Sequence, residues 1–353
     1  MKHRLISARP VCAAALLCLL IFLAVQALLC PKYVEHTPEG ALIGEYYANA
    51  GNNDVLFIGD CEVYENFSPI TLWSMYGIPS CIRGSAQQTI WQSYYLLEEC
   101  FRYDNPKVVI FNVLSLKYDS PESTGRAAKR EAYNRMTLDR MRPSLSKWKA
   151  VCASLTQSER DKESFLTYFC PILRYHDRWS SLTAEDFNYW FKKKPVSVNG
   201  YLMQTGIVPY GDANAEAPPE HYEFEENALC YLERIRLLCE EKGARLVLIK
   251  APSLSPIWWE EWEAQVLAYA ERNKLLYINL LQRQEEIGLD WRTDTYDAGL
   301  HLNVFGAEKA SARLGQILSE ECALPDRRSD AALSAEWQKK TDYYNQLKGS
   351  SLP

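Results

Sequence analysis

The feature that most constrains this chain is an apolar run near its N-terminus, Val11–Cys30, which contains a single polar residue. Twenty apolar residues in a helix span the roughly 30 Å hydrocarbon core of a bilayer. A core helix of a soluble domain is rarely apolar on every side. Basic residues precede the run, so the positive-inside rule places residues 1–10 in the cytoplasm. We expect residues 11–30 to form a transmembrane signal-anchor with the remaining chain outside the cell membrane.

Cleavage of the same run is the alternative. The tripeptide Val25-Gln26-Ala27 offers a small-residue cleavage site, which would release a secreted protein. The apolar run is longer than the hydrophobic region of a usual signal peptide, so the anchor is the preferred interpretation.

Charge and motifs exclude several classes of function. The first thirty residues carry three basic residues and no acidic one, which leaves 36 basic against 45 acidic residues in the remainder. An acidic body of this kind disfavours binding to nucleic acid. The chain lacks the sequence signatures of nucleotide-binding loops, zinc proteases and calcium loops, so we expect no cofactor and no metal.

The chain after the apolar run divides into three parts, the second of which carries an insertion. Residues 31–53 are polar and predict a stalk, and residues 54–325 carry an α/β pattern. Within that pattern, residues from about 119 to 225 are irregular and predict an inserted cap. Residues 326–353 predict a charged C-terminal tail, with a weakly periodic helix from about residue 330 to 347.

Short apolar runs alternate with helical segments through the α/β part. The expected strands are 55–58, 79–83, 107–113, 245–249 and 276–279, and the main expected helices are 88–103, 226–242, 258–273 and 306–318. Strands that are apolar throughout are typical of a parallel sheet buried on both faces. Crossovers of a dozen or more residues then predict a three-layer, doubly wound, mostly parallel sheet.

Two sequence blocks at opposite ends of this part carry candidate chemistry. The first buried strand ends in Gly59-Asp60-Cys61, and a loop with Asp297 and His301 precedes the last helix. In this order the blocks resemble those of the SGNH/GDSL hydrolase superfamily, with a cysteine in place of the nucleophilic serine. The resemblance covers roughly residues 54–320 and implies a flavodoxin-like three-layer fold.

The resemblance also implies roles for individual residues. Cys61 would be the nucleophile and His301 its base, with Gly84 and Asn112 in the oxyanion hole. Asp297 would orient the histidine. Its step of four residues to His301 departs from the family's usual three, so Asp294 is the alternative acid.

Two segments between the blocks, residues 174–179 and 250–253, resemble a membrane-anchored bacterial branch of this superfamily, similar to alginate O-acetyltransferase-like and D-alanyl-lipoteichoic-acid transfer proteins. This implies an esterase or O-acyltransferase that acts on an envelope polysaccharide or another acylated glycopolymer. A transferase would also need a membrane acyltransferase partner to deliver the acyl group. His176 and Arg178 are candidate contacts to such an anionic polymer.

Other interpretations of the same residues stay open. Cys61 could be an inert buried residue, or it could form a disulfide with Cys81 on the neighbouring strand. In either case the chain would be a non-catalytic binding or assembly protein for polymer modification. Trp258 and Trp262 share a helical face, which favours packing in the core over a carbohydrate platform.

Overall fold

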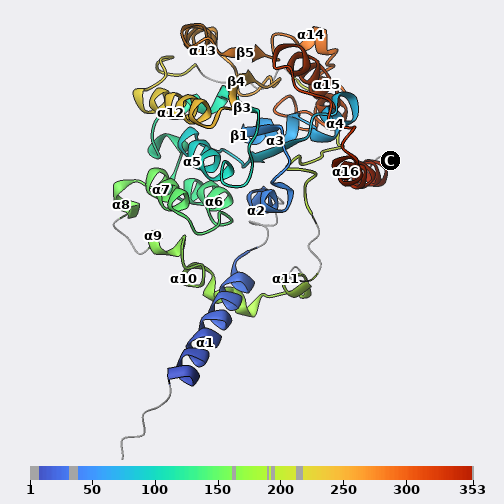
Figure 1. Cartoon of the computed structure of the whole chain (residues 1–353). Coiled ribbons are helices and arrows are strands. Elements are labelled where there is room, and N and C mark those ends of the chain that lie inside the picture. Colours follow the sequence, from blue (N-terminus) through green and yellow to red (C-terminus); the bar gives the residue numbers. More distant parts are fainter. Residues whose placement is uncertain are drawn as a thin grey trace, which may run out of the picture.

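The computed structural model describes residues 8–31, 39–160, 164–188, 191, 195–211 and 218–351. Its centre is a sheet of five strands, all parallel, in the spatial order β2-β1-β3-β4-β5 (Figure 1). The strands are β1 (Val55–Gly59), β2 (Ser80–Gly84), β3 (Val108–Asn112), β4 (Arg245–Lys250) and β5 (Leu276–Asn279). The predicted α/β class with a parallel sheet is therefore confirmed.

The central strand β1 shows why its sequence is apolar throughout. Successive side chains of a strand point to opposite faces of the sheet. Leu56 and Ile58 join the hydrophobic core on one face, and Val55 and Phe57 join the core on the other. All four side chains are fully buried, so no position on this strand could face water.

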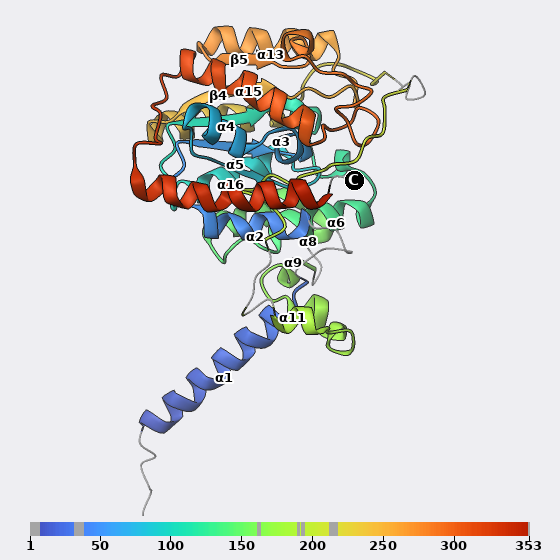
Figure 2. The same ribbon diagram turned by 90° about the vertical axis from the view of Figure 1, so that its right-hand side faces the viewer.

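Helices cover both faces of the sheet (Figures 1 and 2). The core of one face includes residues of α5 (Ile90–Cys100), α12 (Glu226–Lys242) and α13 (Glu260–Asn273). The core of the other includes residues of α3 (Cys61–Asn66), α4 (Pro69–Tyr76) and α15 (Val304–Glu321). Trp262 of α13 is buried, and its ring lies 5.6 Å from that of Trp258. Both tryptophans pack in the core as predicted, but α13 begins at Glu260, so Trp258 reaches the core from the segment before the helix and not from its face.

The predicted stalk is wrong for its second half. Residues 39–49 form the helix α2 (Glu39–Asn49), which packs against β2 and α6 (Ala127–Leu138). Ile43 and Tyr46 of this helix are buried in the same core as α5. The α/β body thus begins at α2, because the helix supplies apolar side chains that cover the sheet beside β2. Residues 32–38 of the predicted stalk lie outside the described residues.

The predicted C-terminal tail is also part of the body. It forms the long helix α16 (Ala331–Ser351), whose Trp337 is 1% exposed and stacks on Trp73 of α4 with ring centroids 5.1 Å apart. Lys348 forms an ion pair with Glu308 of α15. The helix docks through a few large aromatic residues, whereas its overall composition is polar.

The segment predicted as a cap divides between two places. Its helices α6 and α7 (Leu145–Ser154) extend the helical layer beside α5, whereas the short helices over residues 172–180 contact the N-terminal helix α1 (Figure 1). The remaining short helices are α8 (Gln157–Arg160), α9 (Ser164–Thr167), α10 (Ile172–Tyr175), α11 (Ala184–Asn188), α14 (Gln284–Ile287), η1 (Val113–Lys117), η2 (Glu122–Thr124) and η3 (His176–Ser180). Among the described residues, a cap over the sheet is therefore not confirmed.

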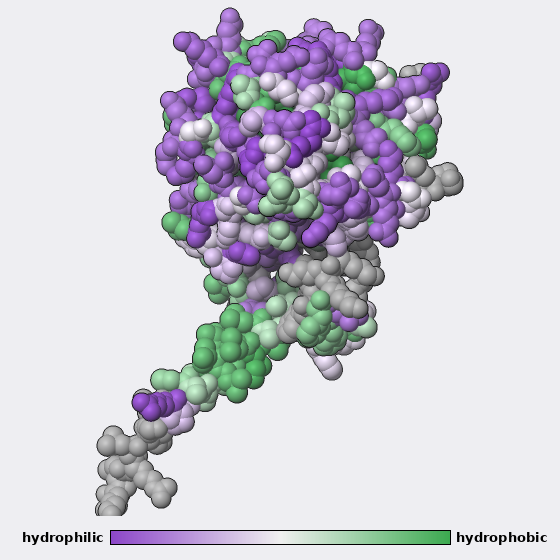
Figure 3. Space-filling view, turned by 45° about the vertical axis from the view of Figure 1, so that its right-hand side comes forward, coloured by the Kyte–Doolittle hydropathy of each residue, from purple (hydrophilic) through white to green (hydrophobic). Residues whose placement is uncertain are grey.

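The apolar N-terminal run forms the helix α1 (Ala8–Leu29), which projects from the body (Figure 2). Among the described residues it is the one helix that is long and apolar enough to cross a membrane. Its apolar side chains give the continuous green surface in Figure 3. Residues 1–7 of the predicted cytoplasmic end lie outside the described residues.

Candidate active site

Cys61 stands at the carboxyl edge of the sheet, as the first residue of α3 directly after β1. Asp60 caps the helix, since its side chain accepts a hydrogen bond from the Glu62 N–H at 3.2 Å. A Cβ at Gly84 would lie 3.0 Å from the carbonyl oxygen of Gly59. Glycine at this position therefore lets the end of β2 approach the turn that presents Cys61.

His301 is brought to the same edge by the loop that precedes α15. Its Nδ1 lies 2.6 Å from Asp297 Oδ2, and its backbone N–H donates to Asp297 Oδ1 at 2.7 Å. The four-residue step between the two is accommodated by a left-handed turn, with φ of +60° at Ala298 and +91° at Gly299. Asp297 therefore lies beside His301 although it precedes the histidine by four residues and not by the family's usual three.

The alternative acid, Asp294, lies elsewhere in the loop. Its Oδ2 lies 2.7 Å from the Lys309 ammonium and accepts a hydrogen bond from the Asp290 N–H at 2.8 Å. These bonds hold the loop to α15. Of the two candidate acids, the structure places Asp297 beside His301.

Glu65 is a site residue that the sequence interpretation missed. Its Oε2 lies 2.9 Å from His301 Nδ1 and also accepts a hydrogen bond from the Tyr296 hydroxyl at 2.9 Å. Glu65 follows Cys61 by four residues, and residues four apart lie on the same face of a helix. That spacing could have identified it. The Tyr296 ring stacks on the imidazole, with centroids 6.1 Å apart.

The thiol and the imidazole affect each other's protonation. Burial lowers the pKa of His301, but the Cys61 charge and hydrogen bonds to Asp297 and Glu65 outweigh it and hold the pKa well above 6.5. Burial raises the pKa of the Cys61 thiol, and His301 opposes that rise. His301 Nε2 is buried and makes no hydrogen bond of ordinary geometry. Because the carboxylates occupy Nδ1, Nε2 is the nitrogen left to face the thiol.

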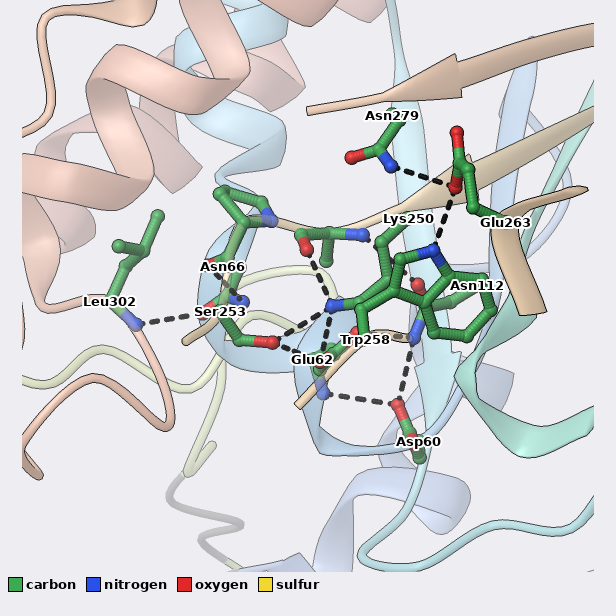
Figure 4. Close-up of polar contacts among 12 residues, drawn as sticks. Asp60, Glu62, Asn66, Asn112, Lys250, Ser253, Trp258, Glu263, Asn279 and Leu302 are labelled. Atoms are coloured by element: carbon green, nitrogen blue, oxygen red, sulfur yellow. Dashed lines mark hydrogen bonds and ion pairs between the residues drawn. The ribbon is translucent and has the colours of Figure 1, made fainter. Parts of the chain in front are cut away.

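A fully buried polar cluster lies beside this site (Figure 4). Lys250 Nζ, at the end of β4, donates to Glu62 Oε1 at 2.8 Å and to Ser253 Oγ at 2.8 Å. Asn112 donates to Glu62 Oε2 at 2.8 Å and to Asp60 Oδ1 at 3.1 Å. Burial and the Glu62 charge raise the pKa of Asp60 to about 6. The hydrogen bonds hold the Glu62 carboxylate toward Lys250 and Asn112, and the cluster fixes the first turn of α3.

The predicted oxyanion donors lie at the carboxyl edge, but one is already occupied. Both hydrogens of the Asn112 amide are engaged by Asp60 and Glu62, and its Oδ1 accepts from the Ala251 N–H at 3.2 Å. Asn112 could donate to a substrate only after one of these bonds breaks. Gly84 is buried against the turn, and both assignments stay predictions.

His176 and Arg178 lie away from Cys61. They belong to η3, which contacts the end of α1, and the Arg178 guanidinium donates to the Leu29 carbonyl at 2.6 Å. The structure does not place them beside Cys61, and their contact with an anionic polymer stays a prediction. Arg178 instead takes part in a junction with the N-terminal helix.

The predicted alternative of a disulfide between Cys61 and Cys81 is not realised, since both are free thiols. In the sheet register Cys81 lies opposite Leu56 of β1. Leu56 comes three residues before Gly59, where β1 ends, and Cys61 lies two residues beyond Gly59. Three residues of strand correspond to about 10 Å. A disulfide needs its two Cα atoms within about 7 Å, so the strands would have to slip to form it.

Glu65, Asp297 and His301 are also the described residues whose arrangement could hold a metal ion, with ligand atoms within 4.8 Å of one another. Both carboxylates already contact Nδ1 at hydrogen-bond distance. A proton on Nδ1, held between the two carboxylates, explains why these three side chains lie together, and a metal ion would have to displace that proton.

Comparison of the chain with protein-family models, curated proteins and solved structures finds no match.

Proposed function

We propose that this protein is a membrane-anchored, extracytoplasmic acyl ester hydrolase or O-acyltransferase that uses Cys61 as its nucleophile. One observation carries the proposal: a half-buried cysteine at a strand-to-helix turn shares a site with a buried histidine whose other nitrogen is held by Asp297 at 2.6 Å. Nucleophile, base and orienting acid are the three groups that acyl transfer through a covalent intermediate requires.

The reaction would proceed in two balanced steps. In the first, the Cys61 sulfur attacks the ester carbonyl, the thiol proton passes to His301, and His301 returns it to the departing alkoxide. The product is an alcohol and a thioester on Cys61. In the second, water or an acceptor hydroxyl attacks the thioester, and His301 moves its proton to the thiolate. Water gives hydrolysis, and a hydroxyl gives transfer.

The carboxylates around Nδ1 support the charged form of the histidine in these steps. Asp297 and Glu65 stabilise the imidazolium that forms whenever His301 takes a proton from the thiol. Burial opposes the thiolate, so the reactive ion pair depends on both carboxylates. The site is therefore built to favour proton transfer from sulfur to nitrogen.

An envelope glycopolymer is the proposed substrate. The resemblance to polymer-modifying proteins and the apolar helix α1 support it, since an anchored body outside the membrane would meet such polymers. Burial raises the pKa of Tyr118 and of Tyr133; the charges of Asp60 and Cys61 add to the rise at Tyr118, and the Cys61 charge adds to the rise at Tyr133, so both rings lie near Cys61. Their rings could contact the sugar part of an ester substrate.

A second candidate is a non-catalytic binding protein on the same fold. It is favoured by the raised pKa of Cys61 and by the engaged amide of Asn112, since both would slow acyl transfer. In that case the buried polar network would serve only to fix the loops at the carboxyl edge.

Ester turnover distinguishes the two candidates. Full-length protein in detergent is incubated with a chromogenic acetyl ester, together with Cys61→Ala and Cys61→Ser variants and with Cys230→Ala, which removes an exposed thiol on α12. The enzyme proposal expects turnover by wild type and Cys230→Ala and none by Cys61→Ala. Equal rates for wild type and Cys61→Ala would reject Cys61 as the nucleophile.

A further inference from the structure

Exposed apolar side chains gather beside the end of α1. They come from α9, α10, η3, α11 and the residue Phe191, and we call them the collar: Leu166, Leu173, Trp179, Phe187 and Phe191. Trp179 is 73% exposed and Phe191 is 85% exposed. Large aromatic side chains are costly to leave in water, so a group of this kind indicates a surface that something covers.

The burial of α1 changes sharply along its length. Side chains such as Leu16 and Leu20 are more than half exposed, whereas Leu29 is 5% exposed and Cys30 is buried as well. The protein therefore covers only the last turn of the helix, and the preceding turns need another apolar environment. The point along α1 where exposed side chains give way to buried ones marks the level at which the helix would leave a bilayer.

The collar lies at this level. Both α10 and η3 contact α1, and Arg178 of η3 donates to the Leu29 carbonyl, which lies at the C-terminal end of the helix. Arg178 also forms an ion pair with Asp186 of α11 at 3.0 Å. This one side chain therefore connects both η3 and α11 to the C-terminal end of α1. Figures 1 and 2 show these segments beside the end of α1, between that helix and the body.

The collar is also fixed to the α/β body. Tyr175 of α10 donates a hydrogen bond to Asp139, and Arg174 forms an ion pair with Glu131 of α6 at 3.0 Å. A collar that enters the bilayer would therefore hold the body at a set height above it.

We propose that the collar inserts into the interfacial layer of the phospholipid bilayer that α1 spans, at the C-terminal end of that helix. The inference rests on the membrane anchoring included in the proposed function. A bilayer is the occupant because the collar continues the apolar surface of α1. Tryptophan and phenylalanine are also residues that membrane interfaces and interfacial helices favour.

Quenching of tryptophan fluorescence by brominated lipids tests the proposal. Full-length protein is reconstituted in phosphatidylcholine liposomes with bromines either near the headgroup or near the chain end, and flotation first establishes that it has inserted. We expect stronger quenching by bromines near the headgroup. Trp179→Phe should lose part of that quenching. Trp259→Phe should leave it unchanged, because Trp259 lies directly before α13, on the opposite side of the body.

The possible failures are distinct. Protein that does not float would overturn the anchoring and this inference together, while ester turnover in detergent would still report on Cys61. Protein that floats but shows the same quenching in wild type and Trp179→Phe would overturn the collar alone, and would leave a second copy or a protein partner as the covering surface. Circular dichroism of Trp179→Phe checks that the fold is retained.

Discussion

Replacement of Lys250 by methionine should destabilise the whole body, because it would strand a buried charge. The Lys250 and Glu62 side chains are at most 1% exposed, and the ammonium donates to Glu62, Ser253 and the Ala251 carbonyl at 2.7–2.8 Å. Methionine fills a similar volume but leaves Glu62 without a cation. Removal of one partner of a buried ion pair costs about 3–5 kcal/mol.

The cost converts to a measurable shift in melting temperature. With an unfolding entropy of ~2.1 cal/mol/K per residue, a body of about 300 residues should melt roughly 5–8 °C lower. Thermal unfolding in detergent, followed by circular dichroism, measures this shift.

A double variant tests the cause of the loss. Glu62→Gln removes the charge but keeps an oxygen for Asn112 and an amide for Ser253, so Glu62→Gln/Lys250→Met should recover most of the lost stability. A Lys250→Met protein that melts within 1–2 °C of wild type, or a double variant less stable than either single one, would refute the reasoning.

Three further outcomes follow from the same contacts. Asp297→Asn should lower kcat/KM for ester turnover by about 10²–10⁴-fold, and Glu65→Gln by less, because Asp297 also binds the His301 backbone. Because burial raises the pKa of Cys61, kcat/KM should climb as pH rises from about 6 to 9; a flat profile in steady-state kinetics would contradict this. Trp337→Ala should cost about 3–5 kcal/mol in urea unfolding, since the indole is buried against α4; a loss below 1 kcal/mol would mean that α16 is a tail.

The sheet was predictable because its strands are buried on both faces. Uniformly apolar runs such as Val108–Phe111 stand out in a sequence, and their crossovers fix a parallel arrangement. The helix α2 was missed for the opposite reason, and so was the docking of the expected C-terminal helix, α16, on the body. Each docks through a few large side chains, such as Ile43 or Trp337, on an otherwise polar helix, so composition pointed to a stalk and a tail.

The position of the candidate site could be predicted because the order of strands and helices along the chain determines which loops lie close together. A residue after β1 and a loop before α15 meet at the carboxyl edge of a parallel sheet, which brings Cys61 and His301 together. The engagement of Asn112 and the junction made by Arg178 depend on side-chain partners from distant segments, such as Glu62 and Leu29. Sequence spacing does not specify those partners.

Mass measurement of the acylated protein tests the central claim most directly. Full-length protein is mixed with a chromogenic acetyl ester, quenched in acid within the first turnover and digested, and the peptide that contains Cys61 is examined for added mass. We predict one acetyl group on Cys61 in wild type, and none at that peptide in Cys61→Ala or in unreacted protein. Turnover without acetyl on Cys61, or acetyl on another residue that persists in Cys61→Ala, would contradict the claim.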